Sequence, residues 1–132
     1  IFNSLSAVNS DKIVTLGIKP THAETGYGYL EYDKNIKSNL FDVIKFVEKP
    51  NIEKARTMFQ KDNYLWNSGI FIFKANVIIK AFQKLEPQMT KSVFKAIQYS
   101  SSDLGFLKLN SESWKECTNI SIDYAILEKV NN

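Results

Sequence analysis

The stretch FDVIKFVEKPNIEKARTMF, residues 41–59, contains the change of pattern that decides the fold class. Its first part is an apolar run that reads as a β-strand and stops at Pro50. From Asn51, a good helix-capping residue, apolar positions such as Ala55 and Met58 recur on one helical face. A strand followed directly by an amphipathic helix predicts an α/β or α+β domain, in which ligands usually lie where strands end.

The rest of the chain repeats this alternation. Further strands are expected at 13–18, 26–33 and 70–73, and helices at 76–85, 87–98 and, with Ser121 as N-cap, in the tail SIDYAILEKV. The strand at 13–18 is expected to be buried, a polar turn is expected at 33–39, and the NYLWNSG and SSDLGF segments read as loops. We therefore expect an antiparallel or mixed sheet with flanking helices.

Composition limits the function. The 132 residues are 44% hydrophobic, which suits one globular domain with a core. Net charge is +3, from 17 basic and 14 acidic residues without a Lys/Arg block, which argues against nucleic-acid and membrane-surface partners. Cys117 is the only cysteine and fits a reducing, cytoplasmic compartment, and no apolar run approaches the roughly 18 residues of a membrane span. The start at Ile1, without Met or a signal-peptide pattern, suggests part of a longer chain.

The first candidate site is the pair Glu48–Lys49 at the end of FVEKPN. Lys49 precedes proline, so an extended backbone is expected, with the two side chains on opposite faces. A lysine there could bind a phosphate oxygen, and a glutamate could bind a pair of sugar hydroxyls. From composition alone, two solvated residues in a strand-to-helix turn are the simpler explanation of the pair.

Three other stretches carry candidate residues. ETGYGY places Glu24 near glycines such as Gly26, which let a backbone approach a ligand closely. In WNSG, Asn67 can bind sugar hydroxyls as donor and acceptor, or can cap its own turn. ISIDYAI puts Asp123 in the first turn of a helix, where the helix dipole favours a carboxylate even without a metal.

Together these stretches resemble one family. GIKPTHAETGYGYLEYD, FVEKPN, YLWNSGIFIF and SIDYAILEK, in this order and spacing, resemble the mannose-1-phosphate guanylyltransferases, including the form fused to a mannose-6-phosphate isomerase domain. The resemblance covers about 13–129. The wider sugar-1-phosphate nucleotidyltransferase group shares the EKP element, whereas GIKPT, ETGYGY and WNSG are more specific.

The resemblance implies a role for each candidate. Lys49 would contact the phosphate of the sugar 1-phosphate and count as catalytic, while Glu48 would bind sugar hydroxyls. Glu24 and the backbone around Gly26 would line the binding site of the same sugar. Asn67 would close that site from another side.

The resemblance also implies the reaction. Asp123 would be one of two aspartates that hold the catalytic Mg²⁺, and GMP would pass from GTP to mannose 1-phosphate. Such catalysis rests on positioning and charge neutralisation, so no general base is required. His22, the only histidine, is read as a loop residue without a role.

One part of the family pattern is missing. The glycine-rich nucleotide loop, its basic residue and the first metal aspartate belong to the family's N-terminal half, and Gly26-Tyr27-Gly28 matches neither G-x-x-x-x-G-K-S/T nor G-x-G-x-x-G. We therefore expect 1–132 to be the C-terminal, sugar-phosphate-binding part of a Rossmann-like nucleotidyltransferase domain. Alone it should be inactive, and its open sheet edge predicts a homo-oligomer or a partly disordered terminus. Two alternatives stay open: a related enzyme using glucose 1-phosphate with UTP or dTTP, and a non-catalytic sugar-phosphate-binding module.

Overall fold

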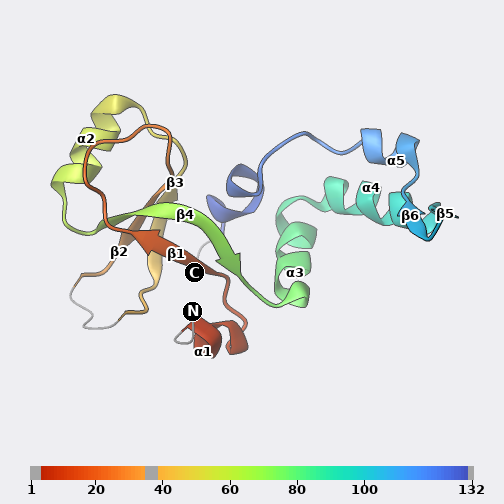
Figure 1. Cartoon of the computed structure of the whole chain (residues 1–132), viewed down its shortest axis with the longest axis horizontal. Coiled ribbons are helices and arrows are strands. Elements are labelled where there is room, and N and C mark those ends of the chain that lie inside the picture. The colour runs from red at the N-terminus through yellow and green to blue at the C-terminus, as the bar shows by residue number, and fades with distance from the viewer. Residues whose placement is uncertain (1–3, 35–38, 131–132) are drawn as a thin grey trace.

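The computed structural model describes residues 4–34 and 39–130. The first part contains α1 (Ser4–Asn9), β1 (Val14–Ile18), β2 (Tyr29–Tyr32), β3 (Val43–Val47), α2 (Ile52–Gln60) and β4 (Tyr64–Ile72). The second contains α3 (Ala75–Leu85), α4 (Pro87–Gln98), β5 (Ser101–Asp103), β6 (Phe106–Lys108), α5 (Ser111–Lys115) and the π-helix η1 (Asp123–Leu127). The sheet and α2 lie at one end, α3 to α5 extend away as an arm, and the chain then returns to η1 beside the sheet (Figure 1).

The sheet has the strand order β1-β4-β2-β3, and each of its ladders within the described ranges is antiparallel. In this order β4 and β2 are the two inner strands, and Tyr29 of β2 stands opposite Trp66 of β4. The α/β fold class is confirmed, and of the two arrangements left open the sheet takes the antiparallel one. β1 is an edge strand, which is why only Val14 is buried in it while Ile18 is 51% exposed, so the expectation of a buried strand was wrong there.

Several predicted elements are confirmed. Asn51 caps α2 by accepting the Lys54 N–H at 2.9 Å, as predicted. Pro87 stands at the start of α4, where its missing N–H costs no helical hydrogen bond. Of the turn expected over 33–39, residues 35–38 lie outside the described residues.

The two loop predictions were wrong. β4 runs without interruption through WNSG to Ile72, and between Thr15 and Gly17 of β1 the register against β4 shifts. Gly69, with φ of +74°, therefore belongs to a bulge inside a strand and not to a loop tip. SSDLGF forms the β5–β6 hairpin, in which Leu104 and Gly105 take positive φ at the turn.

Two smaller differences concern the C-terminal part. α5 follows Asn110, which caps it by accepting the Ser113 N–H at 3.0 Å, and no sequence signal had been assigned to it. The tail is helical as expected, but it is a π-helix that begins at Asp123, and Ile122 rather than Ser121 occupies the cap position. The Ser121 carbonyl instead accepts the Ala125 N–H at 2.9 Å.

The main hydrophobic core lies between α2 and the centre of the sheet. It consists of Tyr29, Ala55, Met58, Tyr64 and Trp66. Burial and a hydrogen bond to Glu31 raise the pKa of Tyr64 to about 12. The α2 contact therefore fixes the strands β2 and β4, from which the candidate site is built.

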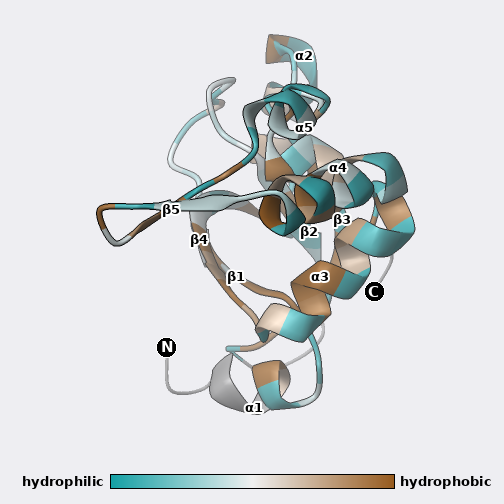
Figure 2. Cartoon of the chain, turned by 90° about the vertical axis from the view of Figure 1, so that its right-hand side faces the viewer, coloured by the Kyte–Doolittle hydropathy of each residue, from teal (hydrophilic) through white to brown (hydrophobic). Residues whose placement is uncertain are grey.

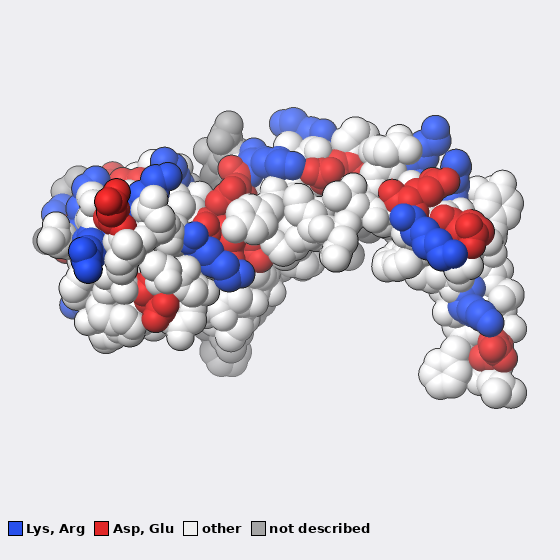
Figure 3. All heavy atoms as spheres, turned by 90° about the horizontal axis from the view of Figure 1, so that it is seen from above, with Lys and Arg blue, Asp and Glu red and all other residues white. Residues whose placement is uncertain are grey.

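The arm presents a different surface. Apolar side chains at the tip of the β5–β6 hairpin are largely exposed, with Leu104 at 95%, and this tip projects from the body in Figure 2. Basic and acidic side chains are interspersed over the face drawn in Figure 3, without a field of one sign. Within the described ranges, no helix is long and apolar enough to cross a membrane.

Candidate functional site

A cavity of about 630 Å³ lies where β1 and β3 end, and we call it the strand-end cavity. This volume is within the usual range for a small-molecule site. Its lining comes from β1, the loop before β2, the turn after β3, β4 and the start of η1: Ile18, Gly26, Tyr27, Gly28, Glu48, Lys49, Trp66, Asn67, Ser68, Gly69, Phe71, Ile122 and Asp123.

Most of the predicted site residues line this one cavity, although they are far apart in the sequence. Those in the lining are Gly26, Glu48, Lys49, Asn67 and Asp123. Glu24 is not part of the lining, and its carboxylate is engaged in the neighbouring turn. The fold thus gathers an ammonium, an amide and two carboxylates around a space that could hold a small ligand.

The backbone of the Glu48–Lys49 turn differs from the prediction. Lys49 is not extended but has a φ of +41°, in the left-handed region. Its ammonium lies 3.0 Å from Glu48 Oε1, so the two side chains are paired rather than directed to opposite faces. The preference of a residue before proline is local, and tertiary contacts override it here. A left-handed non-glycine residue costs about 1–2 kcal/mol and persists only where its surroundings fix it.

Burial within the pair is unequal. The Glu48 side chain is 7% exposed, whereas that of Lys49 is 57% exposed and remains accessible from the cavity. The hydrogen bond and charge of Glu48 raise the pKa of Lys49, and Tyr124 and Asp123 add smaller contributions. Lys49 therefore keeps its positive charge at neutral pH, as a phosphate ligand would require.

Gly28 makes the position of the Glu48 carboxylate possible. A Cβ at Gly28 would lie 2.6 Å from Glu48 Oε2 and 3.2 Å from the Phe46 ring. Both distances are shorter than ordinary van der Waals contacts, so a side chain there would displace the carboxylate. Sequence reasoning had treated Gly28 only as part of a glycine pair, and its role depends on a partner 20 positions away.

Asn67 is held in one orientation. Its Oδ1 accepts the Thr15 hydroxyl at 2.8 Å and the Gly69 N–H at 3.2 Å. Because a backbone N–H can only donate, the second bond identifies this atom as the oxygen. What Asn67 can offer a ligand is therefore its Nδ2 donor, whereas both donor and acceptor had been considered. The turn-capping bond weighed as an alternative is also present.

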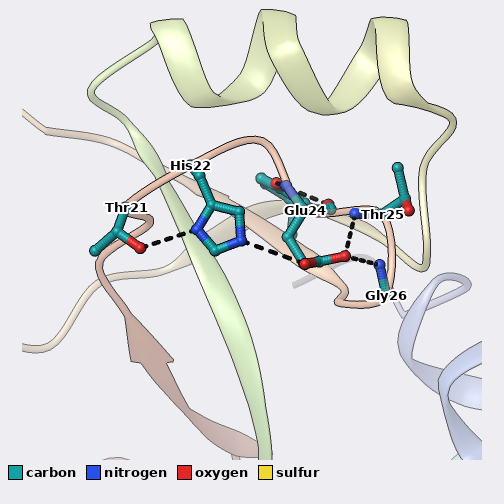
Figure 4. A network of polar contacts seen from close by, with 6 residues as sticks. Thr21, His22, Glu24, Thr25 and Gly26 are labelled. Atoms are coloured by element: carbon teal, nitrogen blue, oxygen red, sulfur yellow. Dashed lines mark hydrogen bonds and ion pairs between the residues drawn. The ribbon is translucent and has the colours of Figure 1, made fainter.

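Glu24 and His22 form a polar network in the loop before β2 (Figure 4). Glu24 Oε1 accepts the N–H groups of Thr25 and Gly26, each at 2.8 Å, and Oε2 lies 3.3 Å from His22 Nε2. The Gly26 N–H, followed by His22 and Thr25, holds the pKa of the Glu24 carboxyl below its ordinary value. This carboxylate shapes the turn that presents Gly26 to the cavity, and His22, to which no role was assigned, takes part in it.

An aromatic wall was missed by sequence reasoning. Trp66 is 7% exposed, and its ring meets those of His22 and Tyr27 edge-on at centroid distances of 5.1 and 5.2 Å. Tyr27 is 48% exposed and lines the cavity. The clue in the sequence was the aromatic residue between the two glycines of ETGYGY. Trp66 and Tyr27 give the cavity an apolar side in addition to its charged groups.

Asp123 opens the π-helix η1, and its carbonyl accepts the Glu128 N–H at 2.9 Å. Single π-turns occur often at functional sites. Over the described ranges, no three His, Cys, Asp or Glu side chains come together as a metal-binding group. Asp123 thus offers one carboxylate to a cation, and further ligands would have to come from water or substrate.

The chain is similar in sequence to known nucleotidyl transferases. The family model described as nucleotidyl transferase matches residues 2–121. Mannose-1-phosphate guanylyltransferase RfbM of Salmonella typhimurium is 42% identical over 117 residues, which are 89% of this chain and 24% of that protein. The mannose-1-phosphate guanylyltransferase of Sinorhizobium fredii is 41% identical over 126 residues, or 96% of this chain and 25% of that protein. The chain thus spans about a quarter of the length of these relatives.

Two solved structures are similar along nearly the whole chain. A Thermus thermophilus structure described as mannose-1-phosphate geranyltransferase has a TM-score of 0.78 and 27% identity, and the match covers 98% of this chain and 36% of that one. A Helicobacter pylori structure described as mannose-6-phosphate isomerase has a TM-score of 0.83 and 24% identity, and the match covers 98% of this chain and 50% of that one. At that identity the second comparison shows a shared fold only.

Proposed function

The chain belongs to the nucleotidyl transferase family, and from this we propose that it is the sugar-phosphate-binding part of a mannose-1-phosphate guanylyltransferase. The observation that carries the proposal is the meeting of Lys49, Glu48 and Asn67 at one cavity. These groups offer a cation for a phosphate, a carboxylate for a pair of hydroxyls and an amide donor. Relatives named for this activity, at 42% and 41% identity, support the choice of mannose 1-phosphate and GTP.

In the proposed reaction a phosphate oxygen of mannose 1-phosphate attacks the α-phosphorus of GTP. A new bond forms between this oxygen and the α-phosphorus, and the bond from the α-phosphorus to the oxygen bridging to the β-phosphate breaks. The leaving group is pyrophosphate, and the other product is GDP-mannose. The attacking phosphate is already ionised, so no base has to remove a proton. Lys49 would hold that phosphate by a charged hydrogen bond, while Glu48 and Asn67 would fix the sugar and thereby the direction of attack.

Asp123 is the residue that we propose as a ligand of Mg²⁺. A single carboxylate is compatible with this ion, which keeps several waters and usually also binds substrate phosphates. When bound, the ion would neutralise charge on the reacting phosphates. Glu24 would contribute through the Gly26 backbone that its turn presents to the cavity, because both of its carboxylate oxygens already have partners in that turn.

The remaining parts of the proposal concern the whole protein. We propose that residues 1–132 are part of a larger catalytic domain whose nucleotide-binding loop lies elsewhere, so that this chain alone does not turn over GTP. We further propose a homo-oligomer and a cytoplasmic location, where sugar phosphates and nucleotides are available. The relatives' greater length supports the first of these statements.

Calorimetric titration of the chain with mannose 1-phosphate tests the proposal, with free mannose and glucose 1-phosphate alongside. We expect binding that requires the phosphate and that Lys49→Ala weakens roughly 10- to 150-fold, the equivalent of one charged hydrogen bond of about 1.5–3 kcal/mol. Lys115→Ala is the matched control, because this lysine is 71% exposed on α5, away from the cavity lining. Equal affinity of wild type and Lys49→Ala for mannose 1-phosphate would contradict the site, and preference for glucose 1-phosphate would contradict the substrate.

A further inference from the structure

We propose that Glu128 is a positioning residue that holds the Lys49 turn and the Asp123 segment in a fixed relation. The consequence for ligand affinity rests on the proposed function, whereas the structural link itself does not. Glu128 is not in the lining of the strand-end cavity, so it would act through Lys49 and Asp123 rather than on a ligand.

Glu128 makes a hydrogen bond to the backbone of each of the two segments. Its Oε1 accepts the Glu48 N–H at 2.8 Å, across 80 positions of sequence. Its own N–H donates to the Asp123 carbonyl at 2.9 Å, closing the π-turn of η1. One residue therefore joins the turn that presents an ammonium to the turn that presents a carboxylate, and both groups line the same cavity.

The Lys49 turn needs such an anchor. Lys49 has a positive φ, which side chains other than glycine disfavour, and it precedes Pro50, which favours an extended backbone. On the downstream side the chain is fixed by Pro50, which is buried, and by Asn51, which caps α2. On the upstream side the bond from the Glu48 N–H to Glu128 supplies the corresponding restraint.

The segment around Glu128 is itself tied to the rest of the molecule. Lys129 pairs with Glu86 at 2.5 Å, at the junction between α3 and α4, and η1 packs against α3. Glu128 therefore belongs to an element that other contacts hold in place, so its carboxylate has a defined position from which to restrain the Lys49 turn. Removing its carboxylate should allow the Lys49 turn to relax, and the ammonium to leave its place in the cavity lining, without removing any group that touches a ligand.

The test uses amide hydrogen exchange by NMR and titration with mannose 1-phosphate for Glu128→Ala, Glu128→Gln and the control Glu112→Ala. Glu112 pairs with Lys115 in an exposed bridge on α5, so its removal is matched in chemistry but lies away from the cavity lining. In Glu128→Ala we expect faster exchange of the Glu48 amide and roughly tenfold weaker binding, the equivalent of one charged hydrogen bond. Gln keeps a carbonyl acceptor and should restore both properties in large part.

A double substitution separates positioning from a general loss of structure. In a Lys49→Ala background, Glu128→Ala should weaken mannose 1-phosphate binding less than it does alone, since the ammonium that it positions is already gone. Faster exchange of the Glu48 amide with unchanged affinity would overturn the positioning role. An equal loss of affinity with and without Lys49 would overturn it as well.

Two further outcomes are separable. If the unsubstituted chain does not bind mannose 1-phosphate, the proposed function fails, while the exchange of the Glu48 amide still decides whether Glu128 holds the turn. If Glu128→Ala does not fold, a scalar coupling across the hydrogen bond between the Glu48 amide nitrogen and the Glu128 carboxyl carbon can be sought in the unsubstituted chain. Its presence supports the link, and its absence overturns it.

Discussion

Replacing Lys49 by alanine and by glycine separates the strain of its backbone from the chemistry of its side chain. Both variants lose the ammonium and the pair with Glu48, so these losses cancel when the two are compared. At a φ of +41°, alanine keeps a cost of about 1–2 kcal/mol that glycine does not have. Glycine loses about 0.5–1 kcal/mol more in backbone entropy on folding. Lys49→Gly should therefore be more stable than Lys49→Ala by roughly 0.5–1 kcal/mol.

Urea unfolding followed by circular dichroism measures this difference, and in a separate thermal unfolding experiment the midpoint temperature should differ by roughly 2–4 °C. The matched control is Arg56, an exposed residue inside α2. There Arg56→Gly should be less stable than Arg56→Ala by about 1 kcal/mol, which is the opposite sign. Both Lys49 variants should lose phosphate-dependent binding of mannose 1-phosphate to the same degree. If Lys49→Ala were as stable as Lys49→Gly or more so, the left-handed backbone at this position would be refuted.

Two other substitutions test the surroundings of the pair. Gly28→Ala should destabilise the fold by about 1–3 kcal/mol and also weaken mannose 1-phosphate binding, because its Cβ would lie 2.6 Å from Glu48 Oε2. Gly17→Ala, whose Cβ would meet Leu65 at 2.5 Å, should destabilise without selective loss of binding, and equal binding losses would contradict this reasoning. Glu24→Gln should make the free energy of unfolding fall less steeply as the pH is lowered into the acid range. The folded-state pKa of Glu24 lies below its ordinary 4.5, so its contribution is present above that pH and is lost as pH falls through the lowered value. Parallel acid unfolding curves for wild type and Glu24→Gln would exclude this contribution.

Much of the fold follows from short-range signals. The start of α2 is encoded by Asn51 and by the helical spacing after it, and the start of α4 is encoded by Pro87. The WNSG segment shows the limit of such signals. Its small and polar residues favour a loop, yet pairing with β1 on one side and β2 on the other keeps it in β4. Pairing across a sheet depends on partners remote in sequence, so local composition could not reveal it.

By itself, the sequence determined the α/β class, the starts of α2 at Asn51 and of α4 at Pro87, and which residue types could bind a phosphorylated sugar. These properties depend on neighbours within a few positions, and a single sequence contains them in full. Only the tertiary structure decided that Lys49 is left-handed and paired with Glu48, that Thr15 and Gly69 orient the Asn67 amide, and that Glu128 reaches the Glu48 N–H. The bonds from Thr15 to Asn67 and from Glu48 to Glu128 join residues tens of positions apart. They form only when the packing of the sheet, α2 and η1 brings those residues together, and that packing can impose a backbone that local preferences disfavour.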